Sequence, residues 1–431
     1  MDYSEAFILV ISFVVLMGVR VPIAYSIGLS ALLTLVVSMP SFPAMTTLAQ
    51  RMATSLDSFA LLAIPFFILA GQVMNQGGIA RRLIDFAKAI VGPLPGGLAF
   101  VNVIACMLFG AISGSAVAAA SAIGGFMNPM MEKEGYDKSF SAAVNITSAT
   151  TGLIIPPSNI LIIYSLASGG VSIAALFLAG YVPGILIGLA LMLVAGVYAW
   201  VKKYPTAKSV GIRIFLKRFL DALPSLLLLV VVIGGIVAGV FTATEASAVA
   251  VVYTFILAFA YKEIELKDVS SILLETTKTT AIVMLLIATS VAMSWVMSYE
   301  SIPQEISAGL LSISSNPIII LIIINLILLF VGIFMDMTPA VLIFTPIFLP
   351  IVTQMGIDPI HFGIIMILNL CIGLCTPPVG SVLFVGCGVA NLKIQQVVRP
   401  LLPMFIVMLV VLLIITYVPK LSLWVPEWFG F

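Results

Sequence analysis

Two short segments, TGLIIPPSN at residues 151–159 and IGLCTPPVG at residues 372–380, decide the fold, because their proline pairs lie 221 residues apart. Each segment sits inside an apolar stretch long enough to cross a bilayer. Two consecutive prolines remove two backbone donors and keep the preceding residue out of the helical region. Non-helical backbone at membrane depth is tolerated only where protein buries it or where it lines a wet cavity. Matched interruptions therefore predict a pair of discontinuous membrane helices of the kind that form binding sites in transporters.

The composition is that of a polytopic α-helical membrane protein. Of 431 residues, 62% are hydrophobic and 9% are charged, against roughly 25% charged in soluble domains. The net charge of +1 gives no reason to expect a nucleic-acid partner. The first apolar stretch follows the acidic segment 1–5 and lacks a basic n-region, so we expect no cleavable signal peptide. The cysteines are expected to be packing residues, since no histidine or further cysteine completes a metal site around any of them: Cys106, Cys371, Cys375 and Cys387.

The apolar pattern predicts ten membrane crossings, two of them broken helices. Their expected bounds are 6–18, 22–39, 59–75, 139–168 (broken), 172–200, 222–240, 243–261, 280–298, 358–390 (broken) and 400–418. Two further apolar regions, 91–130 and 316–353, are too long for one span, and each has a central interruption of Gly, Pro or polar residues. We expect these two regions to be re-entrant hairpins.

The distribution of basic residues predicts the orientation, because cytoplasmic loops carry an excess of Lys and Arg. The loop 201–218 is the most basic and is placed in the cytoplasm; it contains Lys202, Lys203, Lys208, Arg213, Lys217 and Arg218. With that assignment, all of the 19 basic residues except Arg51 and Lys420 fall on the cytoplasmic side. Both termini are then periplasmic, and Trp424 and Trp428 would anchor the outer interface.

The shift of 221 residues also relates the two halves of the chain as repeats, 1–221 and 222–431. Each repeat would hold five crossings and one hairpin, and an odd number of crossings inverts the second copy. We expect scaffold helices at 6–75 and 222–298, a transport domain made of 91–168 plus 316–390, and closing helices at 172–200 and 400–418. The hairpins would enter from opposite faces, and their tips would meet near the midplane.

Amphipathic segments pair under the same shift. Residues 41–56 match 262–277, and residues 79–90 match 300–311, each with apolar residues at helical spacing. Helices with this pattern lie along the membrane interface. We interpret them as horizontal arms that frame a moving domain; the alternative is ordinary interfacial loops.

Four patches place polar side chains and small residues where lipid-facing sequence would not. They are GAISGSA at 110–116, GIFMDMTP at 332–339, Ser158-Asn159 after the first proline pair, and the second break at 376–381. Hydroxyls, amide oxygens and freed carbonyls are hard ligands, and the N-termini of half-helices offer N–H groups to an anion. Together they predict a site for sodium and a carboxylate substrate.

Asp336 is the most informative single residue, because placing an ionisable side chain at the centre of a membrane helix costs at least ~2.5–3.5 kcal/mol of free energy. It could be a sodium ligand or substrate contact, or an N-cap for the helix that follows. Ser113 and Ser115 could likewise serve helix packing. Glu245 has capping-box spacing to Thr242 and is interpreted as a cap. The lone His361 could couple protons, but an interfacial structural role is the simpler interpretation.

Five motifs in this order resemble the large membrane subunit of the tripartite ATP-independent periplasmic (TRAP) transporters: GAISGSA (110–116), IPPSN (155–159), GVFTATEA (239–246), DMTP (336–339) and LCTPPVG (374–380). The resemblance spans nearly the whole chain. It implies a sodium-driven secondary importer of organic acids, of the sialic acid or C4-dicarboxylate class, in the bacterial inner membrane. It also implies an elevator mechanism, a separate four-helix membrane subunit and a periplasmic binding protein that delivers substrate.

The resemblance further implies about two sodium ions, and it carries site residues over by motif position. The first sodium site would involve Ser113, Ser115, Gly152, Pro156 and Ser158, beside Asn159. The second would involve Asp336, Thr338, Gly373, Thr376 and Pro378. The substrate contacts would be Ser113, Ser158, Asn159, Asp336 and Thr338.

Other functional classes have less support. The sequence contains no Walker loop, nucleophile elbow or His-Glu-x-x-His motif, so neither ATP hydrolysis nor an enzyme activity is expected. An intramembrane enzyme would need a catalytic pair, whereas a single carboxylate lies deep in the apolar segments. A non-transporting scaffold would not need matched hairpin tips with cation ligands. The remaining alternative is a stand-alone Na⁺- or H⁺-coupled organic anion permease that needs no binding protein.

Overall fold

The computed structural model describes residues 4–205 and 211–431. Within these ranges the chain forms twenty α-helices and one short 3-10 helix, and no strand. Lys208, which the orientation argument places in the basic loop, lies outside the described residues. The first-half helices are α1 (Ser4–Gly18), α2 (Ile23–Ser38), α3 (Ser41–Ser55), η1 (Phe59–Leu62), α4 (Ala63–Gln76), α5 (Ile79–Val91), α6 (Gly97–Ser113), α7 (Ala116–Lys133), α8 (Lys138–Thr151), α9 (Asn159–Ala167) and α10 (Ile173–Lys202).

The second half repeats this order. Its helices are α11 (Ile212–Val237), α12 (Ala243–Ala260), α13 (Leu266–Tyr299), α14 (Ile302–Ile313), α15 (Pro317–Phe334), α16 (Met337–Gln354), α17 (Pro359–Gly373), α18 (Ser381–Val389), α19 (Ile394–Tyr417) and α20 (Lys420–Trp428). A shift of 221 residues superposes α7 on α16 at both ends, and it brings α6, α8 and α9 onto α15, α17 and α18 to within one residue. The predicted repeat is therefore present in the helix bounds.

The contact between α8 and α17 shows that the repeats are inverted. The Cys371 Sγ lies 3.4 Å from the Thr150 carbonyl oxygen, and the Cys375 Sγ lies 3.4 Å from the Ile146 carbonyl oxygen. Residue number falls along α8 as it rises along α17, so these equivalent helices run antiparallel. Thr150 and Cys371 are equivalent under the shift, and contact between equivalent residues is what a two-fold axis between repeats produces. Reciprocal contacts of α7 with α18 and of α9 with α16 follow the same symmetry.

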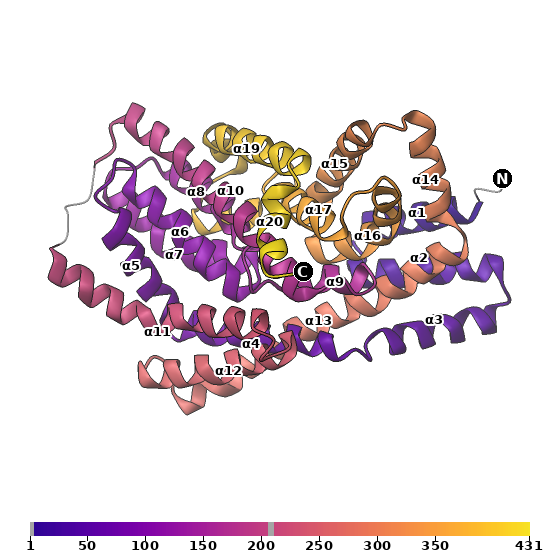
Figure 1. Ribbon diagram of the computed structural model, residues 1–431, viewed down its shortest axis with the longest axis horizontal. Coiled ribbons are helices and arrows are strands. Elements are labelled where there is room, and N and C mark those ends of the chain that lie inside the picture. Colours follow the sequence, from indigo (N-terminus) through magenta and orange to yellow (C-terminus); the bar gives the residue numbers. More distant parts are fainter. Residues whose placement is uncertain (1–3, 206–210) are drawn as a thin grey trace.

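The helices divide into two groups (Figure 1). In one group, α4 packs against α12 and α2 packs against α13, again as a reciprocal pair of contacts. The other group contains the two hairpins, α6–α7 and α15–α16, with the broken helices between them. Figure 1 shows the first hairpin at the left of the view and the second at the right, while α3, α4, α11 and α12 run along its lower edge.

Local sequence explains where many of these helices begin. The side chains of Ser115, Ser172, Thr242, Asn316 and Asp358 each accept a hydrogen bond from a backbone N–H in the first turn of α7, α10, α12, α15 and α17. Such caps satisfy N–H groups that have no partner inside the helix. The cap at Thr242 is a complete capping box, in which Glu245 Oε2 accepts from the Thr242 backbone N–H at 2.8 Å. The interpretation of Glu245 as a cap is confirmed.

Within the described residues, eight helices are apolar and long enough to cross a membrane: residues 59–76, 173–202, 212–237, 243–260, 266–299, 317–334, 337–354 and 394–417. Four shorter apolar helices accompany them. The all-α polytopic fold class is confirmed. Both arms of the second hairpin meet the length criterion, so the re-entrant insertion of the hairpins stays a prediction.

Three features differ from the sequence-based expectation. The amphipathic segment 262–277 and the crossing 280–298 were expected to be separate, but α13 is one continuous helix of 34 residues. No Gly or Pro interrupts its sequence, so nothing forces a break there. The helix α11 begins at Ile212, ten residues before the expected crossing 222–240. The terminal helix α20, which contacts α10 and α17, was not expected.

Candidate functional site

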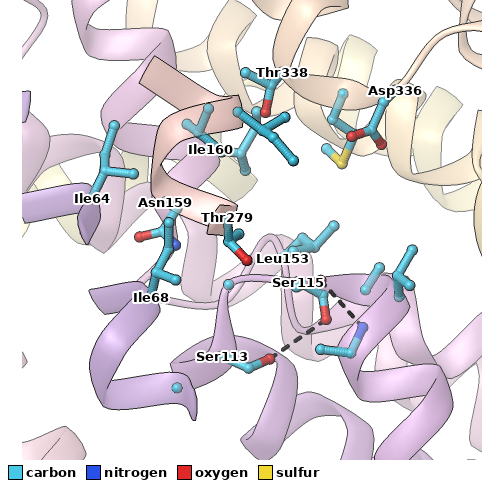
Figure 2. A pocket seen from close by; sticks show the side chains of 18 of the residues that line it. Ile64, Ile68, Ser113, Ser115, Leu153, Asn159, Ile160, Thr279, Asp336 and Thr338 are labelled. Carbon is cyan, nitrogen blue, oxygen red and sulfur yellow. Dashed lines mark hydrogen bonds between the residues drawn. The ribbon is translucent and has the colours of Figure 1, made fainter. Parts of the chain in front are cut away.

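A cavity of about 550 Å³ lies where both hairpin tips and both broken helices converge. On one side, polar residues come from the first tip (Ser113–Ser115), the first break (Asn159) and the second tip (Asp336–Thr338), while Leu374 of the second break completes that side. Helices α4 and α13 form the opposite wall. In Figure 2 the Asp336 carboxylate and the Thr338 side chain lie across the cavity from Ser113 and Ser115. The volume is typical of small-molecule sites, which span roughly 300–1,000 Å³.

Asp336 joins α15 to α16 and is exposed to this cavity. It occupies the N-cap position of α16, but its side chain makes no capping hydrogen bond. Among the described residues, the ion pairs are Arg82–Glu263, Lys267–Glu265 and Lys278–Glu275, so Asp336 has no basic partner there. A role as the N-cap of α16 therefore does not explain why a carboxylate stands at residue 336.

The tip of the first hairpin is a tight turn held by its own side chains. Gly114 has φ +62, a conformation that favours glycine, and a Cβ atom there would lie 2.5 Å from Asn159 Nδ2. Ser115 Oγ accepts a hydrogen bond from the Ala118 N–H at 3.2 Å, and Ser113 Oγ donates to the Ser115 carbonyl at 3.5 Å. The Asn159 Oδ1 is buried and has no hydrogen-bond partner. An acceptor in that condition is available for a ligand.

Each break is packed against its own hairpin through a pair of glycines. A Cβ on Gly152 would lie 2.5 Å from the Cα of Gly110, and a Cβ on Gly373 would lie 2.6 Å from the Cα of Gly332. Real Cβ atoms essentially never approach backbone this closely. Glycine at both breaks therefore lets hairpin backbone and break backbone touch, which fixes the two tips relative to the two breaks.

The two breaks differ in their exposure. Ser158 is fully buried and donates its hydroxyl proton to the Leu153 carbonyl, and Pro156 is also buried. Thr376 is half-buried and donates to the Ile372 carbonyl at 2.8 Å, while Pro378 is exposed. The first break is thus closed by protein, whereas the second is open on one side.

The cavity gathers some of the predicted site residues and not others. Those that line it are Ser113, Ser115, Asn159, Asp336 and Thr338. Those that lie in the adjoining breaks without lining it are Gly152, Pro156, Ser158, Gly373, Thr376 and Pro378. The second group shapes the backbone around the cavity, through the glycine contacts and the hydroxyl-to-carbonyl hydrogen bonds already described.

Four polar residues in the cavity wall escaped the sequence analysis: Gln72, Asn75, Ser121 and Thr279. Gln72 and Asn75 are three residues apart on the apolar helix α4, so they share one face. Two polar residues on one face of an apolar helix could therefore have been identified from the sequence as candidates for a polar cavity wall. Thr279 could not have been found in this way, because the cavity meets the middle of the uninterrupted helix α13.

A sodium ion is compatible with the donors around the cavity. Within the described residues, no group of three or more His, Cys, Asp or Glu side chains could hold a metal, so a transition-metal centre has no support. Sodium is a hard cation, and the oxygens near the hairpin tips are a carboxylate, hydroxyls and an amide oxygen without a partner. The Asp336 carboxylate and the Asn159 Oδ1 are the two best-placed ligand oxygens, since the carboxylate lacks a basic partner and the Oδ1 lacks a hydrogen-bond partner among the described residues.

His361 has a structural environment. It is only 2% exposed, its Nδ1 lies 3.3 Å from Ser422 Oγ, and its Nε2 lies 3.3 Å from the Thr416 carbonyl oxygen. These contacts tie α17 to α19 and α20, away from the residues that line the cavity. The four cysteines are buried free thiols, in keeping with the packing role expected for them.

Comparison with known proteins gives a consistent result. The family model described as "Tripartite ATP-independent periplasmic transporter, DctM component" matches residues 10–421. The chain is 56% identical to the Salmonella typhimurium protein YgiK, with 100% of both chains covered. It is 43% identical to the C4-dicarboxylate TRAP transporter large permease protein DctM of Pseudomonas aeruginosa (94% of both covered). It is 39% identical to the sialic acid TRAP transporter large permease protein SiaM of Vibrio cholerae, over 88% of this chain.

Among solved structures, the fold resembles the YdaH transporter of Alcanivorax borkumensis, with a TM-score of 0.66 at 12% identity and coverage of 89% of this chain and 88% of that one. At this identity the likeness concerns the fold alone. The family match and the relatives carry the assignment, and the family is one of transporter permeases, not of enzymes. The chain is therefore a multi-pass membrane protein that belongs to the DctM family, the large permease subunits of tripartite ATP-independent periplasmic transporters.

Proposed function

We propose that this protein is the permease subunit of a sodium-coupled importer of an organic acid, and that Asp336 and the hairpin tips bind the coupling ions beside the substrate. One observation carries the proposal. The described lining of the cavity includes one acidic side chain, Asp336, and no Lys, Arg or His. An anionic substrate that entered this cavity would meet the Asp336 carboxylate, which has no basic side chain beside it. The substrate therefore needs cations that bind together with it.

The substrates named for the relatives support an anionic substrate for this chain. Their names specify C4-dicarboxylate, sialic acid, 2,3-diketo-L-gulonate and isethionate, and all four are organic acids. In this chain Ser113, Asn159 and Thr338 would contact such a substrate with neutral polar groups. The helices α7 and α16 begin at the two tips, and the positive ends of their helix dipoles would favour its negative charge.

The orientation indicates where the substrate leaves. With the basic loops in the cytoplasm, both termini are periplasmic and the protein lies in the inner membrane. The exposed wall formed by Asn75 and Thr279 is then on the cytoplasmic side of the tips. This wall would be the exit path in an elevator cycle, in which the hairpins and broken helices move against the scaffold helices α1–α4 and α11–α13.

Membership of a tripartite family supports two partners for this chain. A small membrane subunit would be a separate chain in the same bilayer, and a periplasmic binding protein would deliver the substrate. A stand-alone anion permease is the alternative, and uptake assays separate the two. The tripartite proposal requires that uptake into liposomes depends on both partners. Uptake of free substrate by this chain alone would favour the alternative.

The decisive experiment is sodium-driven uptake by the reconstituted complex with Asp336→Asn. This change keeps the shape of the side chain and removes its charge, so we expect loss of sodium dependence and of most uptake. Glu134→Gln is the matched control, because Glu134 is an exposed acid in the α7–α8 loop that does not line the cavity. Normal sodium-coupled uptake by Asp336→Asn would refute the proposed cation site.

A further inference from the structure

The scaffold helix α4 meets the tip of the first hairpin at Gly71. A Cβ atom added to Gly71 would lie 2.9 Å from the Ser113 Cα and 3.2 Å from the Ser113 carbonyl oxygen. Glycine is a poor residue for the interior of a helix, so this close approach gives a structural reason for glycine at residue 71. The backbone of α4 therefore lies directly against the first tip.

The next polar residues of α4, Gln72 and Asn75, are thereby placed beside the tip, where they line the 550 Å³ cavity. Gln72 is half-buried and Asn75 is exposed. Between Ser55 and Arg82, no described side chain makes a hydrogen bond within the chain. Both side-chain amides therefore offer free donors and acceptors to a molecule in the cavity, and an amide can donate two hydrogen bonds and accept two.

The wall formed by α4 and α13 has no charged side chain among its described lining residues. Its polar members are Gln72, Asn75 and Thr279, and the others are aliphatic residues and Gly71. Thr279 projects toward the cavity from α13 (Figure 2), and its hydroxyl donates to the Glu275 carbonyl oxygen at 3.0 Å, which leaves it as an acceptor. Asp336 and the starts of α7 and α16 lie on the opposite side. The cavity thus has an ionic side and a neutral, hydrogen-bonding side.

This division orients an organic acid in the cavity. Its carboxylate would lie at the ionic side with the coupling cations, and the rest of the molecule would extend toward α4. A substrate that covers the Gln72 and Asn75 amides displaces the water bound to them. Hydroxyl or carbonyl groups on the substrate replace the lost hydrogen bonds, whereas methylene groups leave the amides unpaired.

We propose that Gln72 and Asn75 are specificity-determining residues, which hydrogen-bond hydroxyl or carbonyl groups at the end of the substrate remote from its carboxylate. They would select a hydroxylated or keto acid, such as a sugar acid, over an acid with a plain hydrocarbon end. This inference rests on the proposed function and names the substrate class of the same site. The alternative is that the two amides only keep the cavity wall hydrated, and then they would not distinguish a hydroxylated acid from its deoxy analogue.

Binding measurements with matched acids test the proposal. Calorimetry in sodium buffer compares D-gluconate with 6-deoxy-D-gluconate, and N-acetylneuraminate with its 9-deoxy analogue, on the purified full chain with its small subunit. The members of each pair differ by one hydroxyl at the end away from the carboxylate. We expect the hydroxylated member of at least one pair to bind roughly 2- to 10-fold more tightly, the range of one neutral hydrogen bond. Equal affinity within both pairs, or binding of none of the four acids, would overturn the inference.

Variants of α4 assign the preference to the two amides. The double variant Gln72→Leu, Asn75→Leu should bind both members of a pair with equal affinity. Gln76→Leu is the matched control, because Gln76 is an exposed amide on the same helix that does not line the cavity, and it should keep the preference of the parent protein. A preference that survives in the double variant would refute the assignment.

Sodium binding separates this inference from the proposed function. In the absence of any acid, sodium should raise the thermal unfolding midpoint of the parent protein and of the α4 double variant, and this shift should be lost in Asp336→Asn. Discrimination between the acids without a sodium shift would refute the cation site and leave the role of α4 intact. A sodium shift without discrimination would refute the role of α4 and leave the cation site intact.

Discussion

Replacing Gly152 by alanine should destabilise the protein, because the new methyl group has no room. It would lie 2.5 Å from the Gly110 Cα, 2.7 Å from the Gly110 carbonyl carbon and 2.8 Å from the Cys106 carbonyl oxygen. All three atoms belong to the backbone of α6, so no side chain can rotate away. The first hairpin and the first break must separate by several tenths of an ångström, and overpacking of this kind costs about 1–3 kcal/mol.

The same geometry makes the loss of function larger than the loss of stability would suggest. Gly152 holds the first break against the hairpin whose tip carries Ser113 and Ser115. A shift there moves the cavity lining, so sodium-driven uptake should fall even at temperatures where the variant is folded. Gly373→Ala, whose methyl would lie 2.6 Å from the Gly332 Cα, should behave in the same way in the second repeat.

The assay is an unfolding titration with SDS in mixed micelles, followed by uptake in liposomes. Gly125→Ala is the matched control, because Gly125 lies on α7 of the same hairpin and has no atom within 4 Å of an added Cβ. Alanine there should be neutral or stabilising by about 0.5–1 kcal/mol, as expected for glycine inside a helix. If Gly152→Ala matched Gly125→Ala in both stability and uptake, the close contact between break and hairpin would be refuted.

Two further predictions concern side-chain contacts near the ends of helices, at Arg82 and Tyr204. Arg82→Ala removes a cation–π contact with Tyr261 at 3.6 Å together with the ion pair to Glu263, and should lower the unfolding free energy by roughly 0.5–1 kcal/mol or more. An equal effect of Arg81→Ala, at an exposed neighbour, would argue against specific contacts. Burial, together with the hydrogen bond to Asp137, raises the pKa of Tyr204, so the folded state keeps this phenol protonated after the unfolded chain has begun to ionise near pH ~10. Its contribution to stability is therefore complete below that pH and is lost as pH rises through the folded-state pKa. Tyr204→Phe should cost about 0.5–1.5 kcal/mol at neutral pH and flatten the alkaline part of the stability profile; an unchanged alkaline profile would contradict this.

The repeat was visible in the sequence because its strongest marks are backbone requirements. Proline pairs and tight glycines act through local geometry, so they keep their meaning without knowledge of neighbours. The continuous helix α13 was missed for the opposite reason. Its amphipathic first part resembles an interfacial arm. Only the structure shows that this part and the membrane-spanning part after it form one continuous helix.

The residues of the candidate site also fall into two groups: those that the sequence could identify and those that only helix packing identifies. Polar groups at interruptions, such as Ser113, Asn159 and Asp336, stand out against apolar sequence, and the cavity does gather them. The wall formed by Gln72 and Thr279 belongs to ordinary helices, and its relevance depends on which faces pack together. His361 illustrates the reverse case, since its partners Thr416 and Ser422 come from α19 and α20, more than fifty residues away.

The sequence by itself determined the membrane class, the 221-residue repeat and the positions of both breaks, since hydropathy and backbone chemistry are local properties. Only the tertiary structure decided that α8 and α17 cross antiparallel, that one cavity receives both hairpin tips, and that α4 meets the first tip at Gly71. Those features arise from which helix faces meet, and a one-dimensional pattern does not fix the pairing of faces when the membrane-spanning helices are apolar on all sides.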